Sequence, residues 1–226
     1  MGNRNPYRIS VDAKRGHLYW GEVGPDAAND SMDVRGPRGY DEINQARSAG
    51  NFGWPMFIGD NYAYRQWNYA TGNSGAFFDA KAPVNDSRNN TGARNLPPAQ
   101  PAFIWYPYGD TPDFPQLGNG SRTAMAGPVY YRDTFANIHS NALPSYFDGK
   151  LFIYDWIRNW IMAVTLRENG DYDGMERVLP NAKFSAPIDM ETGPDGRLYL
   201  LEYGKGWFAK NPDAALTRIE FRGSAR

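Results

Sequence analysis

The sequence predicts an all-β protein with a β-propeller architecture. Three observations support this prediction: a high content of turn formers, a high content of aromatic residues, and a strand-like segment that recurs along the chain. The 226 residues include 24 Gly and 17 Pro, which favour many turns, and 15 Tyr, 12 Phe and 7 Trp, which favour short strands over long helices. We therefore expect short strands joined by tight turns throughout the chain.

The recurring segment occupies residues 16–22, 149–155 and 196–202. Each copy begins with Gly, continues with a basic residue or His, then Leu and an aromatic residue, and has an acidic residue six positions after the Gly. Gly149 and Gly196 are 47 residues apart, and the 133 residues between Gly16 and Gly149 are close to three such steps. A period of this length, with a turn that leads into a strand, is typical of propeller blades.

The number of blades follows from dividing the length by the period, which gives five. Fewer blades with a long insertion are an open alternative, because the strand-like segments 53–58 and 102–106, where further blades are expected, do not share the repeat. Within the first blade, we expect a hairpin between residues 8–11 and 18–20 that turns at Gly16. The whole chain, 1–226, is predicted to be one domain in which residues 60–101 form a long loop, or lid, over one end of the propeller.

Charge and composition exclude several classes of protein. With 24 basic and 25 acidic side chains the formal net charge is −1, which argues against a nucleic-acid partner. No apolar stretch is long enough for a membrane helix, and no apolar run follows Met1–Pro6, so we expect neither a membrane anchor nor a signal peptide in this sequence. Because the chain has no Cys and only two His, any metal should be bound by oxygen atoms.

Three carboxylates hold the same position in the repeat, and this suggests a shared role. Glu22, Asp155 and Glu202 should lie at matching heights, and on strands that face the axis they would converge on the central channel. Converging carboxylates repel one another unless a hard cation such as Ca²⁺ or an Arg compensates their charge. The alternative is that each acid pairs with a neighbouring Arg or caps a loop.

A second group of oxygen donors lies between residues 24 and 42. It combines the turn formers Gly24 and Pro25 with the carboxylates of Asp26, Asp41 and Glu42. Calcium accepts backbone carbonyl and carboxylate oxygens equally well, so this irregular segment suits it. We therefore predict a Ca²⁺ site with ligands drawn from the following residues: Gly24, Pro25, Asp26, Asp41, Glu42, Asp155 and Glu202.

Four successive motifs resemble signatures of the glucose/sorbosone dehydrogenase family, which includes soluble quinoprotein glucose dehydrogenases. They are residues 2–6 (GNRNP), the pair Gly24–Pro25, residues 41–44 (DEIN) and residues 50–55 (GNFGWP); residues 187–190 and 193–199 resemble the last blade of the same family. The resemblance implies a propeller, calcium, pyrroloquinoline quinone (PQQ) in the oxidising members, and a secreted or periplasmic location. It also implies that Arg4 and Asn5 contact quinone and substrate, and that the carbonyls of Gly24 and Pro25 hold calcium.

Two departures from the family pattern guide the functional prediction. The family's catalytic His precedes the Arg-Asn motif, where this chain has three residues, and the segment that should clamp the quinone carboxylates, residues 185–191, is acidic. We therefore expect a calcium-dependent hydrolase that opens a lactone or sugar-derived ester, in which Ca²⁺ polarises the carbonyl.

In that hydrolase, Glu22 or Asp26 would activate water, and Arg4 and Asn5 would hold the substrate. The first alternative is a PQQ-dependent aldose or sorbosone dehydrogenase, with Arg4 and Asn5 binding the cofactor. The second is a non-catalytic carbohydrate-binding propeller. All three hypotheses imply a small-molecule ligand. An incompletely closed ring would expose edge strands and would therefore favour a homo-oligomer.

Overall fold

A computed structural model describes residues 1–137 and 141–223. It contains strands and three short 3-10 helices, with no α-helix among the described residues, so the all-β prediction is confirmed. None of these residues forms a helix of the length and apolar character needed to cross a membrane.

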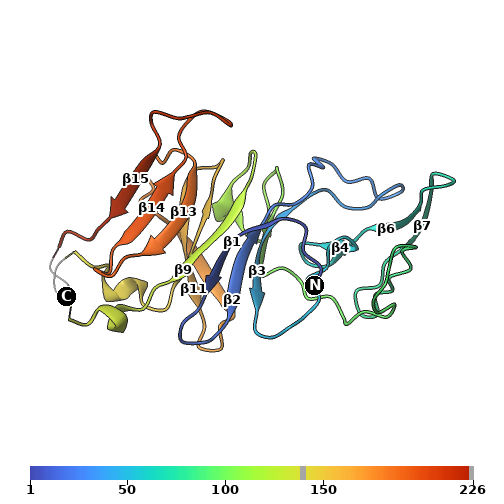
Figure 1. Cartoon of the computed structure of the whole chain (residues 1–226), viewed down its shortest axis with the longest axis horizontal. Helices are drawn as coiled ribbons and strands as arrows, with labels where there is room; N and C mark the ends of the chain where they lie inside the picture. Colours follow the sequence, from blue (N-terminus) through green and yellow to red (C-terminus); the bar gives the residue numbers. More distant parts are fainter. Residues whose placement is uncertain (138–140, 224–226) are drawn as a thin grey trace.

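Three sheets of three or four strands make up the body of the molecule (Figure 1). The first sheet has the order β1-β2-β3-β8, the second β12-β11-β10-β9, and the third β13-β14-β15. The bounds are β1 Pro6–Val11, β2 Leu18–Glu22, β3 Asp41–Ala46, β8 Ile104–Tyr106, β9 Ala124–Val129, β10 Leu151–Asp155, β11 Trp160–Leu166, β12 Tyr172–Val178, β13 Pro187–Thr192, β14 Leu198–Glu202 and β15 Ala215–Ile219. Neighbouring strands within these sheets are antiparallel.

The three sheets are arranged as consecutive propeller blades that do not close into a ring. Their first strands lie together, because β9 contacts both β1 and β13. The structure therefore matches the expected alternative of fewer blades with a long insertion. The segments expected to start further blades do not do so: β8 completes the first sheet beside β3, and Phe57–Ile58 forms the short strand β4.

The repeat glycines form the turns that the sequence predicts. Gly16, Gly149 and Gly196 have φ values of 69°, 73° and 72°, a region that residues with a side chain rarely adopt. Gly16 closes the expected hairpin, in which Ile9 pairs with Trp20 and Val11 with Leu18. The 3-10 helices are η1 Pro115–Leu117, η2 Arg132–Phe135 and η3 Ser145–Phe147.

Two apolar clusters join the sheets. Tyr19 and Ile43 of the first sheet pack with Ile153 and Met162 of the second, whereas the opposite face of the second sheet packs on the third through residues such as Leu200. Gly21 is required at the first of these contacts, since a Cβ there would lie 2.1 Å from the carbonyl oxygen of Ala124. Close packing of this kind fixes the relative positions of the strand ends, where the candidate site lies.

The insertion extends from the first sheet at the end of the molecule away from the third sheet (Figure 1). It contains two small hairpins, formed by β4 with β5 (Tyr62–Ala63) and by β6 (Arg65–Asn68) with β7 (Asn73–Phe77). Residues 60–101, which the sequence predicts to be a long loop, therefore contain short strands. Arg35 lies 4.7 Å from the Trp67 ring centroid and Arg65 lies 4.0 Å from that of Phe77, so these two aromatic residues help to hold the insertion together.

Candidate functional site

The three repeat carboxylates end the second strand of their sheets. Each accepts hydrogen bonds from backbone amides that lead into the first strand of the same sheet. Glu22 accepts from Arg4 and Asn5, Asp155 from Thr123, and Glu202 from Ser185. The repeated acid therefore fixes the entry of each sheet, which confirms the expectation that these residues cap loops.

The expectation that these acids converge on the channel is wrong. They lie on β2, β10 and β14, each in a different sheet, whereas the sheets contact one another mainly through β1, β9 and β13. Among residues 1–137 and 141–223, no group of three or more His, Asp or Glu side chains could hold a metal ion. The physical reason is that a carboxylate already surrounded by backbone donors at its own sheet is fixed there.

Asp41 forms the centre of the most buried polar cluster at this end. It is fully buried, accepts from the backbone amides of Gly24 and Ala124 at 3.0 and 2.9 Å, and lies 3.1 Å from Nε of Arg122. Burial raises the pKa of Asp41 to about 7, and the neighbouring Arg122 opposes that rise. Arg122 also donates to the carbonyl oxygen of Pro25 at 2.8 Å and lies 3.9 Å from the Tyr108 ring centroid.

Glu42 forms a second buried carboxyl site on the opposite face of the first sheet. Glu42 lies opposite Glu22 in the register of β3 with β2. Its carboxylate accepts from the backbone amide of Gly59 at 2.6 Å and from the side-chain amide of Asn44 at 2.9 Å. Burial raises the pKa of Glu42 to about 7. The buried amide oxygen of Asn44 and the buried hydroxyl of Tyr64 have no hydrogen-bond partner within the described chain, so they can receive a water or a ligand group.

Tyr64 links these clusters to the N-terminal motif. Burial raises its pKa to about 12; Glu42 adds to that rise, whereas Arg122 and Arg4 oppose it, so all three charges act on the same hydroxyl. The Arg4 guanidinium is exposed, donates to the carbonyl of Val23 at 2.7 Å and lies 5.6 Å from the Trp54 ring centroid. Trp54 in turn packs edge-on against Tyr64. The result is an exposed Arg and a half-buried indole beside buried unpartnered oxygen atoms.

Two other predicted site residues lie at the surface of this end. Asn5 is exposed, and its backbone amide donates to Glu22 at 3.2 Å. Asp26 is exposed and accepts from the hydroxyl of Tyr108 at 2.7 Å. Both therefore lie near Gly24 and Pro25, as the sequence predicts. His17 lies elsewhere, against Gly170, and His139 lies outside the described residues.

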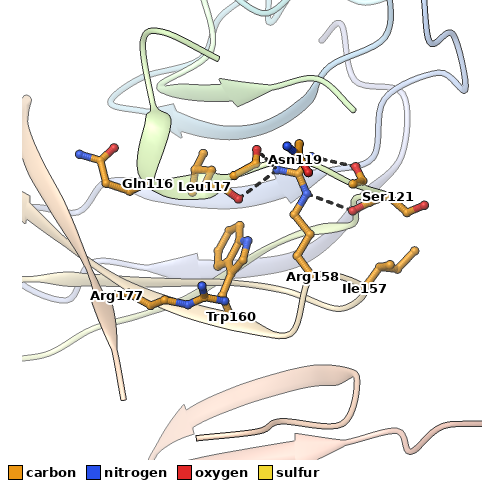
Figure 2. A pocket seen from close by; sticks show the side chains of 10 residues that line it. Gln116, Leu117, Asn119, Ser121, Ile157, Arg158, Trp160 and Arg177 are labelled. Carbon is orange, nitrogen blue, oxygen red and sulfur yellow. Dashed lines mark hydrogen bonds between the residues drawn. The ribbon is translucent and has the colours of Figure 1, made fainter. Parts of the chain in front are cut away.

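Arg158 positions the loop that precedes Arg122. Its guanidinium donates to backbone carbonyls from residues 107 to 121, including those of Leu117, Gly120 and Ser121, and Figure 2 shows it directed into this loop. The same residues line a pocket of about 270 Å³ together with Trp160 and Arg177. The sequence analysis missed Arg122 and Arg158. One available signal was that Arg122 precedes β9 by two residues, as Arg4 precedes β1.

The calcium site implied for Gly24 and Pro25 does not fit these contacts. Arg122 and the backbone amide of Ala27 both donate to the Pro25 carbonyl oxygen at 2.8 Å, which uses its two lone pairs. The exposed Arg4 and the half-buried Trp54, by contrast, suit a planar anionic ring, because a guanidinium pairs with carboxylates and an indole stacks on flat ligands.

Comparisons with known proteins agree with the motifs. Residues 1–87 match the family model described as Glucose / Sorbosone dehydrogenase. A comparison with curated proteins finds no match.

Several solved structures of glucose and aldose sugar dehydrogenases are similar to this chain. A crystal structure of glucose dehydrogenase is 19% identical, with 96% of this chain and 45% of that chain covered and a TM-score of 0.52. A putative oxidoreductase (glucose dehydrogenase) from Thermus thermophilus is 19% identical, with coverages of 97% and 46% and a TM-score of 0.53. The PQQ-bound aldose sugar dehydrogenase from Streptomyces coelicolor is 13% identical, with coverages of 97% and 44% and a TM-score of 0.49.

The chain thus spans less than half the length of these structures. The first two show the fold over nearly the whole chain, and the family model covers its N-terminal motifs. The resemblance predicted from the sequence is confirmed for the N-terminal motifs, which lie in the segment that matches the glucose/sorbosone dehydrogenase family model.

Proposed function

We propose that this chain forms part of a quinone-dependent dehydrogenase that oxidises an aldose or a related sugar. The main support is that the segment matching the family model, residues 1–87, builds the corner formed by Arg4, Trp54 and Tyr64. This alternative has better support than the calcium-dependent lactonase favoured by the sequence analysis.

The contacts of the predicted water-activating residues also weaken the lactonase reading. Glu22 is buried and already accepts from two backbone amides and from the indole of Trp20 at 3.0 Å. Asp26 accepts from Tyr108. A general base needs a free acceptor within reach of the proton that it removes, and the Glu22 carboxylate is occupied by donors of its own sheet.

Each group at this corner has a distinct task in the proposed reaction. Glu22 fixes the backbone of Arg4 and Asn5, which keeps the Arg4 guanidinium beside Trp54. Arg4 and Trp54 would hold the cofactor, Arg4 through a charge-assisted pair with a carboxylate and Trp54 through its indole, and the side-chain amide of Asn5 would bind a sugar hydroxyl. When bound, PQQ supplies the two-electron acceptor.

The test is dye-linked oxidation of aldoses after the purified chain is loaded with PQQ. We expect dye reduction that depends on both quinone and sugar, and a loss of more than about tenfold in the affinity for PQQ with Arg4→Ala, the loss expected from one charge-assisted contact. Arg94→Ala is the matched control, because Arg94 is exposed and its ion pair among the described residues is with Asp86. Absence of quinone-dependent dye reduction, or equal PQQ affinity in the two variants, would contradict the proposal.

A further inference from the structure

The corner around Gly24 and Pro25 contains a positive charge that belongs to the chain itself. The Arg122 side chain is 1% exposed and contacts both the Asp41 carboxylate and the Pro25 carbonyl. The same guanidinium lies over the Tyr108 ring. Because it is held on three sides, Arg122 cannot leave this corner without breaking a buried ion pair.

The backbone around the guanidinium leaves little space. A Cβ on Gly39 would lie 1.8 Å from the carbonyl oxygen of Pro25 and 2.6 Å from Nη2 of Arg122. A Cβ on Gly24 would lie 1.8 Å from the carbonyl oxygen of Tyr40. The two glycines therefore allow the two loop segments to approach each other and to close around Arg122.

The corner already contains a buried ion pair. Asp41 provides one negative charge, and Arg122 provides one positive charge beside it. A divalent ion placed at the Pro25 oxygen would displace the Arg122 and Ala27 donors and would lie next to a buried guanidinium. Like charges repel strongly where burial excludes water, so the ion and Arg122 cannot share the corner.

We propose that Arg122 is the resident cation of the Gly24–Pro25 corner and takes the place of the divalent ion that the family resemblance implies. This inference rests on the proposed function in one respect, because it predicts that the quinone-dependent activity of this chain does not need calcium. Arg122 acts as a positioning residue, because it holds Pro25, Asp41 and the entry to β9 in place and is too buried to reach substrate.

The test combines calcium titration with thermal unfolding of the whole chain. Calcium affinity is measured by calorimetry for wild type, Arg122→Gln and Arg122→Lys, and melting temperatures are measured with chelator and with added Ca²⁺. We expect wild type and Arg122→Lys to bind no calcium and the wild-type melting temperature to be unchanged by chelator, whereas Arg122→Gln, which removes the competing charge, should bind calcium best of the three. Arg122→Gln should melt about 10 °C lower, because it leaves a buried carboxylate unpaired.

One control and one second variant make the result decisive. Arg94→Gln, which removes an exposed ion pair, should melt within about 2 °C of wild type. If Arg122→Gln does not fold, Arg122→Lys and wild type still give the calcium comparison. The inference is overturned if wild type binds one calcium at least as tightly as either variant does. A failure of dye reduction would refute the proposed function alone, because the calcium and melting measurements do not depend on activity.

Discussion

Replacement of Asp155 by Asn tests whether the repeated carboxylate fixes the entry of each sheet. Asp155 is fully buried and accepts four hydrogen bonds. The donors are the backbone amides of Thr123, Ile157 and Arg158 at 2.9, 2.8 and 2.7 Å and the hydroxyl of Tyr106 at 2.8 Å. Asn has the same shape, but its amide nitrogen can only donate, so it would face either the two amides of Ile157 and Arg158 or the amide of Thr123 and the hydroxyl of Tyr106, of which only the hydroxyl can turn to accept.

The magnitude follows from these contacts. Each hydrogen bond to a charged acceptor contributes about 1.5–3 kcal/mol, so the loss of one or two costs roughly 1.5–6 kcal/mol. Burial raises the pKa of Asp155, which means that the ionised carboxylate also carries a desolvation cost that Asn removes. We therefore expect a net loss of about 2–4 kcal/mol, a large part of the ~5–15 kcal/mol that stabilises a typical domain.

Urea unfolding followed by tryptophan fluorescence measures this loss. Asp173→Asn is the matched control, because Asp173 is exposed and its only described ion pair is with Arg167 at the surface. That variant should unfold within about 0.5 kcal/mol of wild type. An Asp155→Asn protein that unfolds within about 1 kcal/mol of wild type would refute the reasoning.

Three further predictions concern the same end of the molecule. Burial raises the pKa of Glu42 to about 7, above its ordinary value of 4.5, so the folded protein keeps a proton that the unfolded chain has lost. The unfolding free energy should therefore fall by roughly 3 kcal/mol from this group as pH rises from about 4.5 to 7. Urea unfolding across this range should show that Glu42→Gln removes that contribution; an unchanged slope would contradict it. Gly39→Ala should cost more than about 2 kcal/mol because its Cβ meets the Pro25 oxygen, whereas Gly109→Ala, with open space around it, should change stability by less than about 0.5 kcal/mol in the same assay. Arg158→Ala should speed hydrogen exchange in residues 107–121 at least about tenfold, while Arg177→Ala, beside the same pocket, should not; equal exchange in both would show that Arg158 does not hold this loop.

Local features of the fold could be predicted from the sequence. Gly16, Gly149 and Gly196 each need a positive φ that the sequence indicates through its turn pattern, and the strand Trp160–Leu166 follows from its β-branched residues. The number of blades could not be predicted in the same way. Strand β8 joins the first sheet only through pairing with β3, across the whole insertion, and no local pattern indicates such a distant partner.

The candidate site was predicted in part for the same reason. Arg4 and Asn5 contact Glu22 and Val23, directly before Gly24 and Pro25, because they enter or leave neighbouring strands of one sheet, and their role in binding stays a prediction. Glu22, Asp155 and Glu202 hold the same position in each copy of the repeat, but this position does not reveal which strand of a blade they end. The prediction that they converge on the channel was therefore wrong. Arg122 was missed because its pairing with Asp41 joins two sheets that are far apart in the sequence.

Titration of the purified chain with PQQ by isothermal calorimetry, in the presence of chelator, tests the central claim most directly. The account predicts one binding site that persists without calcium and that weakens more than about tenfold when Arg4 is replaced by Ala. A chain that binds no quinone with or without calcium, or that binds it only when calcium is restored, would contradict the account.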